Sequence, residues 1–322
     1  MNVFFLAAGL GTRLRPLTDK YPKPCVPLLN APLGYYQFRF LQNQKITGCV
    51  ANSFHLPEQV AELYKGQTYL NSKFSISAEA GGKILGSAGG LKRASEYFST
   101  NDPILMMNAD EVFFTQNPEF LQNVLKQHHA NNNLATLVVM KHPEAGQKFG
   151  AIWCDEKSKV KNILAAKSVP EQIGNILTPW HYIGVMVLNP KVLSLIPDGL
   201  ETNIFYDILI HELAQNSVEV FKLDCTWFET GNSTDYLSAT KKLLTGLSLK
   251  DLDFINTYDP SHLVTNEKGV SLISDSVKIS TDSLIGYNVV SGSTNPEILG
   301  RTNVIENSVL FENEILNAGY FA

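Results

Sequence analysis

The sequence is poor in cysteine. Only four of its 322 residues are cysteines, Cys25, Cys49, Cys154 and Cys225, and they stand far apart. No CxxC pair and no Cys/His spacing suggests a zinc site, and so sparse a set does not predict a disulfide framework. We therefore expect a protein of a reducing compartment, the cytoplasm.

The sequence also lacks long hydrophobic runs and low-complexity tracts. No apolar stretch reaches the roughly 18–20 residues that span a bilayer, so no membrane partner is expected. The apolar start, residues 1–9, is short and carries no basic segment, which favours a first β-strand over a signal peptide. With 44% hydrophobic and 18% charged residues, the composition is that of a globular protein.

Basic residues are slightly outnumbered by acidic ones, and the two are unevenly distributed. Twenty-six Lys and Arg against thirty-one Asp and Glu give a formal net charge of −5, so nucleic acid is not an expected partner. Residues 251–322 hold ten acids and three bases, whereas residues 1–250 hold twenty-one acids and twenty-three bases. The acidity therefore belongs to the C-terminal part.

Short apolar runs alternate with amphipathic segments over the first 250 residues. This alternation predicts βαβ units and an α/β fold whose parallel sheet is covered on both faces. Strands are expected at 3–8, 48–52, 74–78, 104–108, 135–140 and 183–188, helices at 33–44, 56–64, 91–97, 118–130, 204–215 and 236–246, and a hairpin at 149–163. His128 and His129 end one helix, where we expect solvated positions or positions favoured by the helix dipole, rather than metal ligands.

A hexad pattern appears after residue 272. It runs through Ile273, Ile279, Ile285, Ser291, Leu299, Ile305 and Phe311, spaced 6, 6, 6, 8, 6 and 6. Such hexads predict a β-helix of little more than two coils, the alternative being an accidental run of short strands. We therefore divide the chain into a main domain, 1–250, and a linker with a β-helix, 251–322. So small a solenoid is expected to contact the main domain, a second copy or a partner subunit.

The loop after the first strand suits a phosphate chain. Residues 9–18 read GLGTRLRPLT, and small residues at the end of a parallel strand let backbone N–H groups approach phosphate. Between residues 13 and 23, four bases face only Asp19. Leu14 excludes the dinucleotide-binding GxGxxG fingerprint, and no Gly-Lys-Ser/Thr of a P-loop is present. The alternative is an ordinary strand-to-helix turn with surface arginines.

Several motifs then occur in a recognisable order. Residues 6–24, LAAGLGTRLRPLTDKYPKP, resemble the signature of the sugar-1-phosphate nucleotidyltransferases, the NDP-sugar pyrophosphorylases. Residues 52–56, 85–90 (LGSAGG), 108–110 (NAD), 182–185 and 227–231 (WFETG) resemble later segments of that family, so the resemblance covers essentially the whole chain. It implies a Rossmann-like, mostly parallel mixed sheet flanked by helices, the nucleotidyltransferase fold, with a short C-terminal left-handed β-helix.

The resemblance also implies a reaction and a set of site residues. The family joins a nucleoside triphosphate to a sugar 1-phosphate, giving an NDP-sugar and pyrophosphate. Arg13 and Lys23 would be catalytic, and Asp110 and Glu229 would hold Mg²⁺. The nucleotide would be bound by Leu6, Ala8, Gly9, Gly11, Thr12, Gly86, Ser87 and Asn108, and the sugar phosphate by Gly150, Lys167 and Gly184.

The sequence departs from the family pattern at three places. Glu229 stands where Asp is usual, Ala109 replaces Gly, and residues 165–168 lack the glutamate of a Glu-Lys-Pro motif. The overall look is closest to guanylyltransferases that use GTP and a mannose- or heptose-type phosphate, with a uridylyltransferase as the alternative. The departures also leave open a catalytically weak, NDP-sugar-binding regulatory protein.

Overall fold

Two compact units make up the chain in the computed structural model. The structure describes residues 1–42, 44–65, 74–79, 82–98, 102–168, 177–246, 249–267, 269–279, 284–290, 305–306, 308–311 and 314–317. Unit 1 comprises residues 1–9 and 37–227, and unit 2 comprises residues 10–36 and 228–322.

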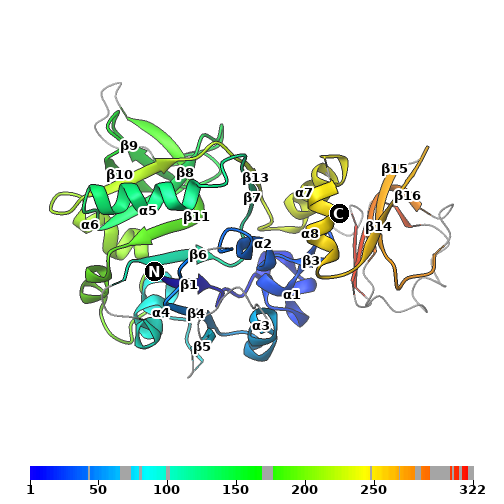
Figure 1. Cartoon of the computed structure of the whole chain (residues 1–322), viewed down its shortest axis with the longest axis horizontal. Helices are drawn as coiled ribbons and strands as arrows, with labels where there is room; N and C mark the ends of the chain where they lie inside the picture. Colours follow the sequence, from blue (N-terminus) through cyan, green and yellow to red (C-terminus); the bar gives the residue numbers. More distant parts are fainter. Residues whose placement is uncertain are drawn as a thin grey trace. The chain divides into compact units, whose positions relative to one another are not determined.

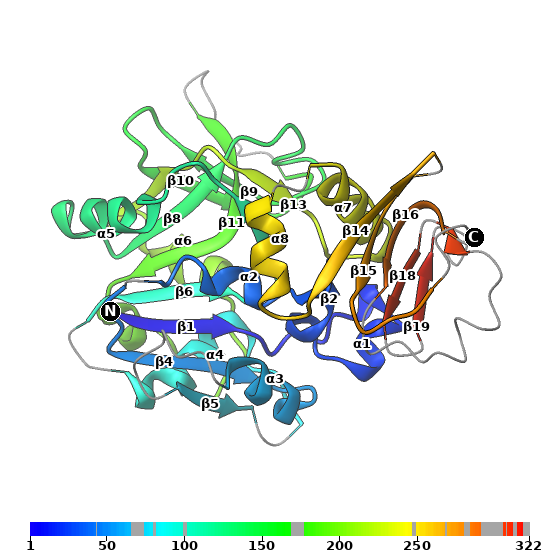
Figure 2. The ribbon, with the colours of Figure 1, turned by 45° about the vertical axis from the view of Figure 1, so that its right-hand side comes forward.

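Unit 1 is built on a nine-stranded mixed sheet (Figures 1 and 2). Its strands are β1 (Asn2–Leu6), β4 (Gly48–Ser53), β5 (Phe74–Ala78), β6 (Ile104–Asn108), β8 (Ala135–Met140), β9 (Ala151–Cys154), β10 (Val160–Leu164), β11 (Thr178–Leu188) and β12 (Val218–Lys222). The order is β10-β9-β11-β6-β1-β4-β5, and β8 joins β11 to β12. The strands β6, β1, β4 and β5 are parallel, whereas β11 runs antiparallel to β6, β8 and β9. The expected α/β sheet is confirmed as a mixed sheet, parallel in one half.

The first strand shows why the sheet is covered on both faces. Phe4 and Phe5 point to opposite faces, and both are fully buried. Phe4 belongs to the core that includes Leu91 of helix α4 (Gly86–Ala94). Phe5 packs on Phe38 and Tyr64, with ring centroids 5.5 and 4.8 Å away. A strand buried on both faces reads as a continuous apolar run, as residues 3–8 do.

Helices and short strands complete unit 1. They are α2 (Tyr35–Phe38), which straddles the unit boundary, α3 (Pro57–Tyr64), α4 (Gly86–Ala94), η3 (Ser95–Tyr97), β7 (Val112–Phe114), α5 (Phe120–Ala130), η4 (Pro190–Leu195), η5 (Ile204–Leu209), α6 (Ile210–Glu212) and β13 (Thr226–Phe228). The helix predicted at 56–64 is α3, which begins one residue later at Pro57, because proline fits the first turn of a helix.

Some predicted elements differ from the structure. The helix expected at 91–97 already begins at Gly86, and the one expected at 33–44 shortens to α2. The segment expected as a helix at 204–215 starts as a π-helix. The side chain of Asn203 accepts hydrogen bonds from the N–H groups of its first turn. Strand β12 was not predicted from the sequence, and it extends the sheet by pairing with β8.

Unit 2 joins segments that lie far apart in the sequence. Residues 10–36 carry η1 (Thr12–Leu14), α1 (Leu17–Lys20), η2 (Lys23–Cys25), β2 (Pro27–Leu28) and β3 (Ala31–Pro32), and they group with helices α7 (Ser233–Gly246) and α8 (Leu249–Asn256). The hydroxyl of Tyr236 on α7 donates to the carbonyl of Pro27. The predicted division into 1–250 and 251–322 stays a prediction.

The C-terminal part of unit 2 forms a six-stranded mixed sheet. Its strands are β14 (Ser261–Asn266), β15 (Gly269–Ser274), β16 (Leu284–Val290), β17 (Ile305–Glu306), β18 (Ser308–Phe311) and β19 (Glu314–Asn317). The inner pairs β15–β16 and β16–β18 are parallel, and the outer pairs are antiparallel (Figure 2). Ile273, Leu284, Val290 and Leu310 form its core. The hexad positions Ser291 and Leu299 lie outside the described residues.

The cysteines and the helices bear on the predicted redox compartment and on the predicted absence of a membrane partner. The four cysteines are free thiols, and burial raises the pKa of both Cys25 and Cys49 to about 12. Of the helices that the structure describes, none has both the length and the hydrophobicity needed to cross a bilayer.

The two adjacent histidines of α5 have different surroundings. His129 is exposed, but His128 is 3% exposed and its Nδ1 lies 3.0 Å from Oγ1 of Thr136. The prediction of a solvated side chain is therefore wrong for His128, because that face of the helix packs on β8. Burial, aided by the charge of His129, lowers the pKa of His128 to about 4.

This lowered pKa predicts acid sensitivity of the fold. Between about pH 6.5 and pH 4 the unfolded chain binds a proton at His128 that the folded chain does not, so stability rises with pH across this window. We expect His128→Gln to remove up to about 3 kcal/mol of the loss in unfolding free energy between pH 7 and pH 4. Urea unfolding at several pH values measures it, with His129→Gln as the control. Equal pH slopes for both variants contradict the prediction.

Candidate functional site

The carboxyl ends of the parallel strands bring the first predicted site residues together. Leu6 at the end of β1 is in register with Asn108 at the end of β6. The backbone N–H of Ala109 donates to the carbonyl of Leu6 at 3.1 Å. Ligands of open α/β sheets bind outside this edge. Leu6, Ala8 and Asn108 therefore lie where the sequence predicts a ligand.

The residues that follow β1 are held by Asn52 at the end of β4. Its Oδ1 accepts the N–H groups of Ala7 at 2.7 Å and Ala8 at 3.2 Å. The N–H of Ala8 is therefore already bonded within the protein. A phosphate contact of this segment has to come from later in the loop, which begins at the exposed Gly9.

Gly11 gives the loop its shape. Its backbone is left-handed, with φ +61°, and a Cβ there would lie 3.0 Å from Cγ2 of Thr18 and 3.1 Å from Cβ of Lys23. Its carbonyl accepts the hydroxyl of Thr18 at 2.9 Å. The turn thus packs Gly11 directly on Lys23, while Thr12 and Arg13 of η1 are exposed. Two predicted site residues, Gly11 and Lys23, are neighbours here.

Arg13 and Glu229 both lie near Gly231. Oε1 of Glu229 accepts the N–H of Gly231 at 2.5 Å, and a Cβ on Gly231 would lie 2.3 Å from that oxygen and 3.3 Å from Nη2 of Arg13. The carboxylate of Glu229 therefore folds back onto the N–H two residues ahead. A cation and a carboxylate of unit 2 therefore share one spot beside Gly231.

Glu111, which follows Asp110, is a site residue that sequence reasoning missed. Its carboxylate accepts Nε1 of Trp227 at 2.7 Å and Nδ2 of Asn108 at 3.3 Å. Gly184 has φ +76°, and a Cβ there would clash with Cγ of Glu111. Glycine at 184 thus makes room for a glutamate, and an acid pair directly after a strand was the signal available in the sequence.

The predicted base-binding segment packs against the loop before η5. A Cβ on Gly86, which has φ +71°, would lie 2.5 Å from the carbonyl oxygen of Thr202. The hydroxyl of Ser87 accepts the N–H of Ile204 at 2.8 Å. Gly86 and Ser87 therefore have a structural task in unit 1, and their contact with a base stays a prediction.

Gly150 precedes strand β9 and Lys167 follows strand β10, so both lie at the open end of this hairpin. A Cβ on Gly150 would be 3.0 Å from the carbonyl oxygen of Leu164, and the N–H of Lys167 donates to the carbonyl of Gly146 at 3.1 Å. Lys167 is exposed, with a left-handed φ of +63°. The structure thus brings two of the three predicted sugar-phosphate residues to the open end of the hairpin.

An aromatic cluster lies next to Glu111. The ring of His181 lies 4.4 Å from that of Trp227 and 4.9 Å from that of Phe149, between ring centroids. His181 is 7% exposed, and neither ring nitrogen has a hydrogen-bond partner among the described residues. Burial and the charge of His142 lower its pKa to about 4. The cluster fixes Trp227, and Trp227 in turn fixes the carboxylate of Glu111.

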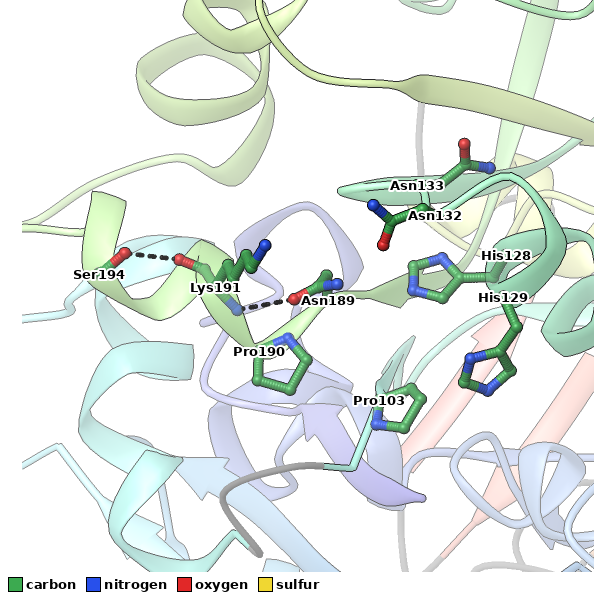
Figure 3. Close-up of a pocket in the computed structure, with 9 residues that line it drawn as sticks. All are labelled: Pro103, His128, His129, Asn132, Asn133, Asn189, Pro190, Lys191 and Ser194. Carbon is green, nitrogen blue, oxygen red and sulfur yellow. Dashed lines mark hydrogen bonds between the residues drawn. The ribbon is translucent and has the colours of Figure 1, made fainter.

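A polar pocket of about 560 Å³ lies at the opposite edge of the sheet. Leu188 of β11 pairs with Ile104 of β6, and the pocket forms where these two strands respectively end and begin. Its lining residues are Pro103, His128, His129, Asn132, Asn133, Asn189, Pro190, Lys191 and Ser194 (Figure 3). No predicted site residue lines it, so the strand ends at Leu6 and Asn108 remain the candidate site.

The sequence of this chain matches a known family. The family described as Nucleotidyl transferase matches residues 3–246. This range covers the whole sheet of unit 1, the loop at residues 9–24 and helix α7. The chain belongs to the nucleotidyl transferase family. It is therefore an enzyme of the transferase class.

Relatives of this nucleotidyl transferase use different nucleotides. It is 25% identical to a UTP–glucose-1-phosphate uridylyltransferase of Synechocystis, over 99% of this chain and 85% of the relative. It is 32% identical to the mannose-1-phosphate guanyltransferase of Yarrowia lipolytica, over 78% of this chain and 66% of the relative. The corresponding enzyme of Pichia angusta is 31% identical, over 87% and 73%.

Solved structures show the same fold. HddC from Yersinia pseudotuberculosis, complexed with GMP-PN, covers 75% of this chain and 99% of its own, with a TM-score of 0.57 and 19% identity. A UDP-glucose pyrophosphorylase complexed with UDP-glucose covers 76% and 98%, with a TM-score of 0.61 and 15% identity. The fold of this nucleotidyl transferase is therefore the nucleotidyltransferase fold.

Gly9 and Gly11 offer a matched test of the loop. We expect Gly11→Ala to lower the unfolding free energy by about 1–3 kcal/mol, because a left-handed backbone and two close neighbours oppose a Cβ. Gly9→Ala meets no atom within 4 Å and should stay within about 0.5 kcal/mol of the original chain. Urea unfolding compares the two, and equal losses would contradict this account of the loop.

Proposed function

We propose that this enzyme transfers a nucleoside monophosphate from a nucleoside triphosphate to a sugar 1-phosphate, forming an NDP-sugar and pyrophosphate. The packing of the Lys23 stem on the left-handed turn at Gly11 carries the proposal, because it places a lysine beside the glycine-rich loop. The names of the guanyltransferase and uridylyltransferase relatives support it.

The chemistry needs positioning and charge neutralisation above all. Both reactants are anionic, so the attacking phosphate and the triphosphate repel each other as they approach. In the proposed reaction Arg13 holds the triphosphate and the departing pyrophosphate with its fork of donors, and Lys23 contacts the α-phosphate or the incoming phosphate. Fixed cations of this kind stabilise charge that develops in the transition state. Gly9, Gly11 and Thr12 would supply backbone groups to the same phosphates.

Mg²⁺ is the proposed cofactor, with Asp110 and Glu229 as its carboxylate ligands. No cluster of three or more acidic, His or Cys side chains suited to a metal occurs within the ranges that the structure describes. Such a cluster is not required, because Mg²⁺ takes one or two carboxylates and completes its shell with phosphate oxygens and water. The donor chemistry of the two residues therefore fits this ion, which would supply charge neutralisation on the phosphates.

Base and sugar are assigned by resemblance. GTP with a mannose- or heptose-type phosphate is our first choice, and UTP is the alternative, since both activities occur among the relatives. Gly86 and Ser87 would line the base, while Gly150, Lys167 and Gly184 would bind the sugar phosphate. The free thiols favour a reducing compartment, and we propose a cytoplasmic location.

We also propose that the parallel strands at the C-terminus form a short left-handed β-helix. Gly269 pairs with Gly286, and Val289 with Val309, so equivalent positions recur after 17 and 20 residues. Three hexads make 18 residues, about one coil. We further propose that this β-helix contacts a second copy of the chain or a partner subunit.

Release of pyrophosphate tests the function directly. GTP, UTP, dTTP, CTP and ATP are each paired with several hexose and heptose 1-phosphates in the presence of Mg²⁺. Turnover is expected with at least one pair. Tight binding of an NDP-sugar without turnover of any pair would favour the regulatory alternative, which the engagement of Glu229 by the N–H of Gly231 supports.

Lys23→Ala should reduce the rate at least ~10²-fold, equivalent to about 2.7 kcal/mol of transition-state stabilisation. The reason is the loss of a fixed cation beside the reacting phosphate. Steady-state kinetics of pyrophosphate release measure the effect. Lys126→Ala, an exposed lysine on α5, is the control and should behave like the original enzyme. A Lys23 variant with unchanged kinetics overturns the assigned role.

Asp110→Asn should raise the Mg²⁺ concentration for half-maximal rate at least ~10-fold, because a neutral amide is a much weaker ligand for this hard cation than a carboxylate. Titration of Mg²⁺ at saturating substrates gives this value. Asp198→Asn, an exposed aspartate, is the control. The same Mg²⁺ requirement in both variants shows that Asp110 is not a ligand.

A further inference from the structure

We propose that Asn52 and Glu79 are positioning residues for the nucleotide: a buried relay of hydrogen bonds through their side chains sets the distance between two backbone segments of the site. This inference rests on the proposed nucleotide transfer and adds a pair of residues that lie behind the site. One segment is Ala7–Ala8, which leads into the loop at Gly9. The other is Leu85, which leads into Gly86.

The relay is continuous and short. Oδ1 of Asn52 accepts the N–H groups of Ala7 and Ala8 at 2.7 and 3.2 Å. Nδ2 of Asn52 donates to Oε1 of Glu79 at 2.6 Å, and Oε2 of Glu79 accepts the N–H of Leu85 at 2.7 Å. Both side chains are buried, with Asn52 0% and Glu79 4% exposed. Every oxygen and nitrogen of the two side-chain end groups is thus engaged.

The surrounding backbone packs closely around the side chains of Asn52 and Glu79. Glu79 directly follows β5, and its N–H donates to the carbonyl of Ser53 at the end of β4 at 2.8 Å. A Cβ on Gly90 of α4 would lie 2.6 Å from Nδ2 of Asn52 and 2.7 Å from Oε1 of Glu79. The strand ends and the helix therefore enclose the Asn52–Glu79 hydrogen bond from several sides.

The direction of each hydrogen bond is fixed by chemistry. The two ends of the relay are backbone N–H groups, which only donate, so each needs an acceptor. A carboxylate at Glu79 accepts from both Leu85 and Asn52, and this orients the Asn52 amide with its oxygen toward β1. Burial raises the pKa of the Glu79 carboxyl, while the hydrogen bonds from Leu85 and Asn52 and the charge of Arg93 oppose that rise.

This arrangement links two predicted nucleotide-binding segments that are nearly 80 residues apart in sequence. The loop at Gly9 is the proposed phosphate segment, and Gly86 and Ser87 are the proposed base segment. Errors of about 1 Å in the placement of binding groups can cost as much as ~10²-fold in rate. We therefore expect the relay to act on nucleotide affinity, beyond its contribution to stability.

An exchange of the two side-chain types tests the proposal. In Asn52→Asp a carboxylate oxygen faces Oε1 of Glu79, and the two repel each other. In Glu79→Gln the new amide group faces the N–H donor of either Asn52 or Leu85 with an N–H of its own. Each single variant should therefore bind nucleotide at least about tenfold more weakly. In the double variant the new carboxylate at position 52 would accept from Ala7, Ala8 and the new amide at position 79, whose oxygen accepts from Leu85. This double variant keeps all bonds and the total charge, and its Kd should return to within about threefold of the original.

Calorimetry of GTP and of UTP with Mg²⁺ gives Kd, and thermal unfolding of each variant is recorded beside it. Thr136→Val is the matched control, because it removes a buried hydroxyl that accepts from Asn133 and contacts His128 at the opposite edge of the sheet. It should lower Tm by a similar amount and leave Kd unchanged. If the single variants lower Tm but keep the original Kd, or if the folded double variant binds as weakly as they do, the proposal is wrong.

Two further outcomes are distinguishable. Should a single variant fail to fold, Gly90→Ala decides, because its methyl group would press on both atoms of the Asn52–Glu79 hydrogen bond without removing either. It should weaken binding at least about fivefold, and an unchanged Kd overturns the relay. An original chain that binds nucleotide without turnover refutes only the proposed transfer, whereas a chain that binds no nucleotide refutes both.

Discussion

The end of strand β1 imposes a constraint on which the rest of the site depends. Ala7 and Ala8 are buried, so their backbone N–H groups need acceptors inside the protein. Asn52 supplies one oxygen for both, at 2.7 and 3.2 Å. Leaving such a donor unpaired would cost about 1–3 kcal/mol. The backbone from the end of β1 to Gly9 is therefore held in one conformation, and the proposed phosphate loop begins from this fixed end.

Three glycines of the candidate site lie against charged side chains. Gly11 packs on Lys23, Gly184 on Glu111, and Gly231 on Glu229. A Cβ would collide with the side chain at Gly184 and Gly231, and at Gly11 it would crowd the stem of Lys23 at 3.1 Å. The close approach matters more than backbone flexibility, because it fixes long side chains that would otherwise lose rotamer entropy on binding a ligand. This explains why charged groups that sequence analysis could only enumerate have defined positions.

Much of the sheet could be predicted from the sequence, whereas many of the hydrogen bonds that hold the candidate site could not. The strands at 74–78, 104–108 and 135–140 were predicted to the residue. At 104–108 and 135–140 the reason is a short apolar run, which marks a buried strand. Other features depend on partners distant in sequence. No periodicity shows that Tyr236 bonds Pro27, and hence that residues 10–36 group with the C-terminal segment. A lone acid such as Glu79 likewise has no local pattern that reveals its role.

The net charge of −5 says less about ligands than the local pairing of charges in the loop does. Arg15 already pairs with Asp19 at 2.9 Å, and Arg13 shares the neighbourhood of Gly231 with Glu229. Part of the loop's positive charge is therefore compensated before any ligand arrives. Under the proposed function this arrangement suits a nucleotide bound together with Mg²⁺, because Arg13 would bind phosphate oxygens and the carboxylate of Glu229, which accepts the N–H of Gly231, would be a ligand for the metal. The local charges therefore fit a short triphosphate that brings its own cation, in keeping with a loop whose positive charge is small and partly paired.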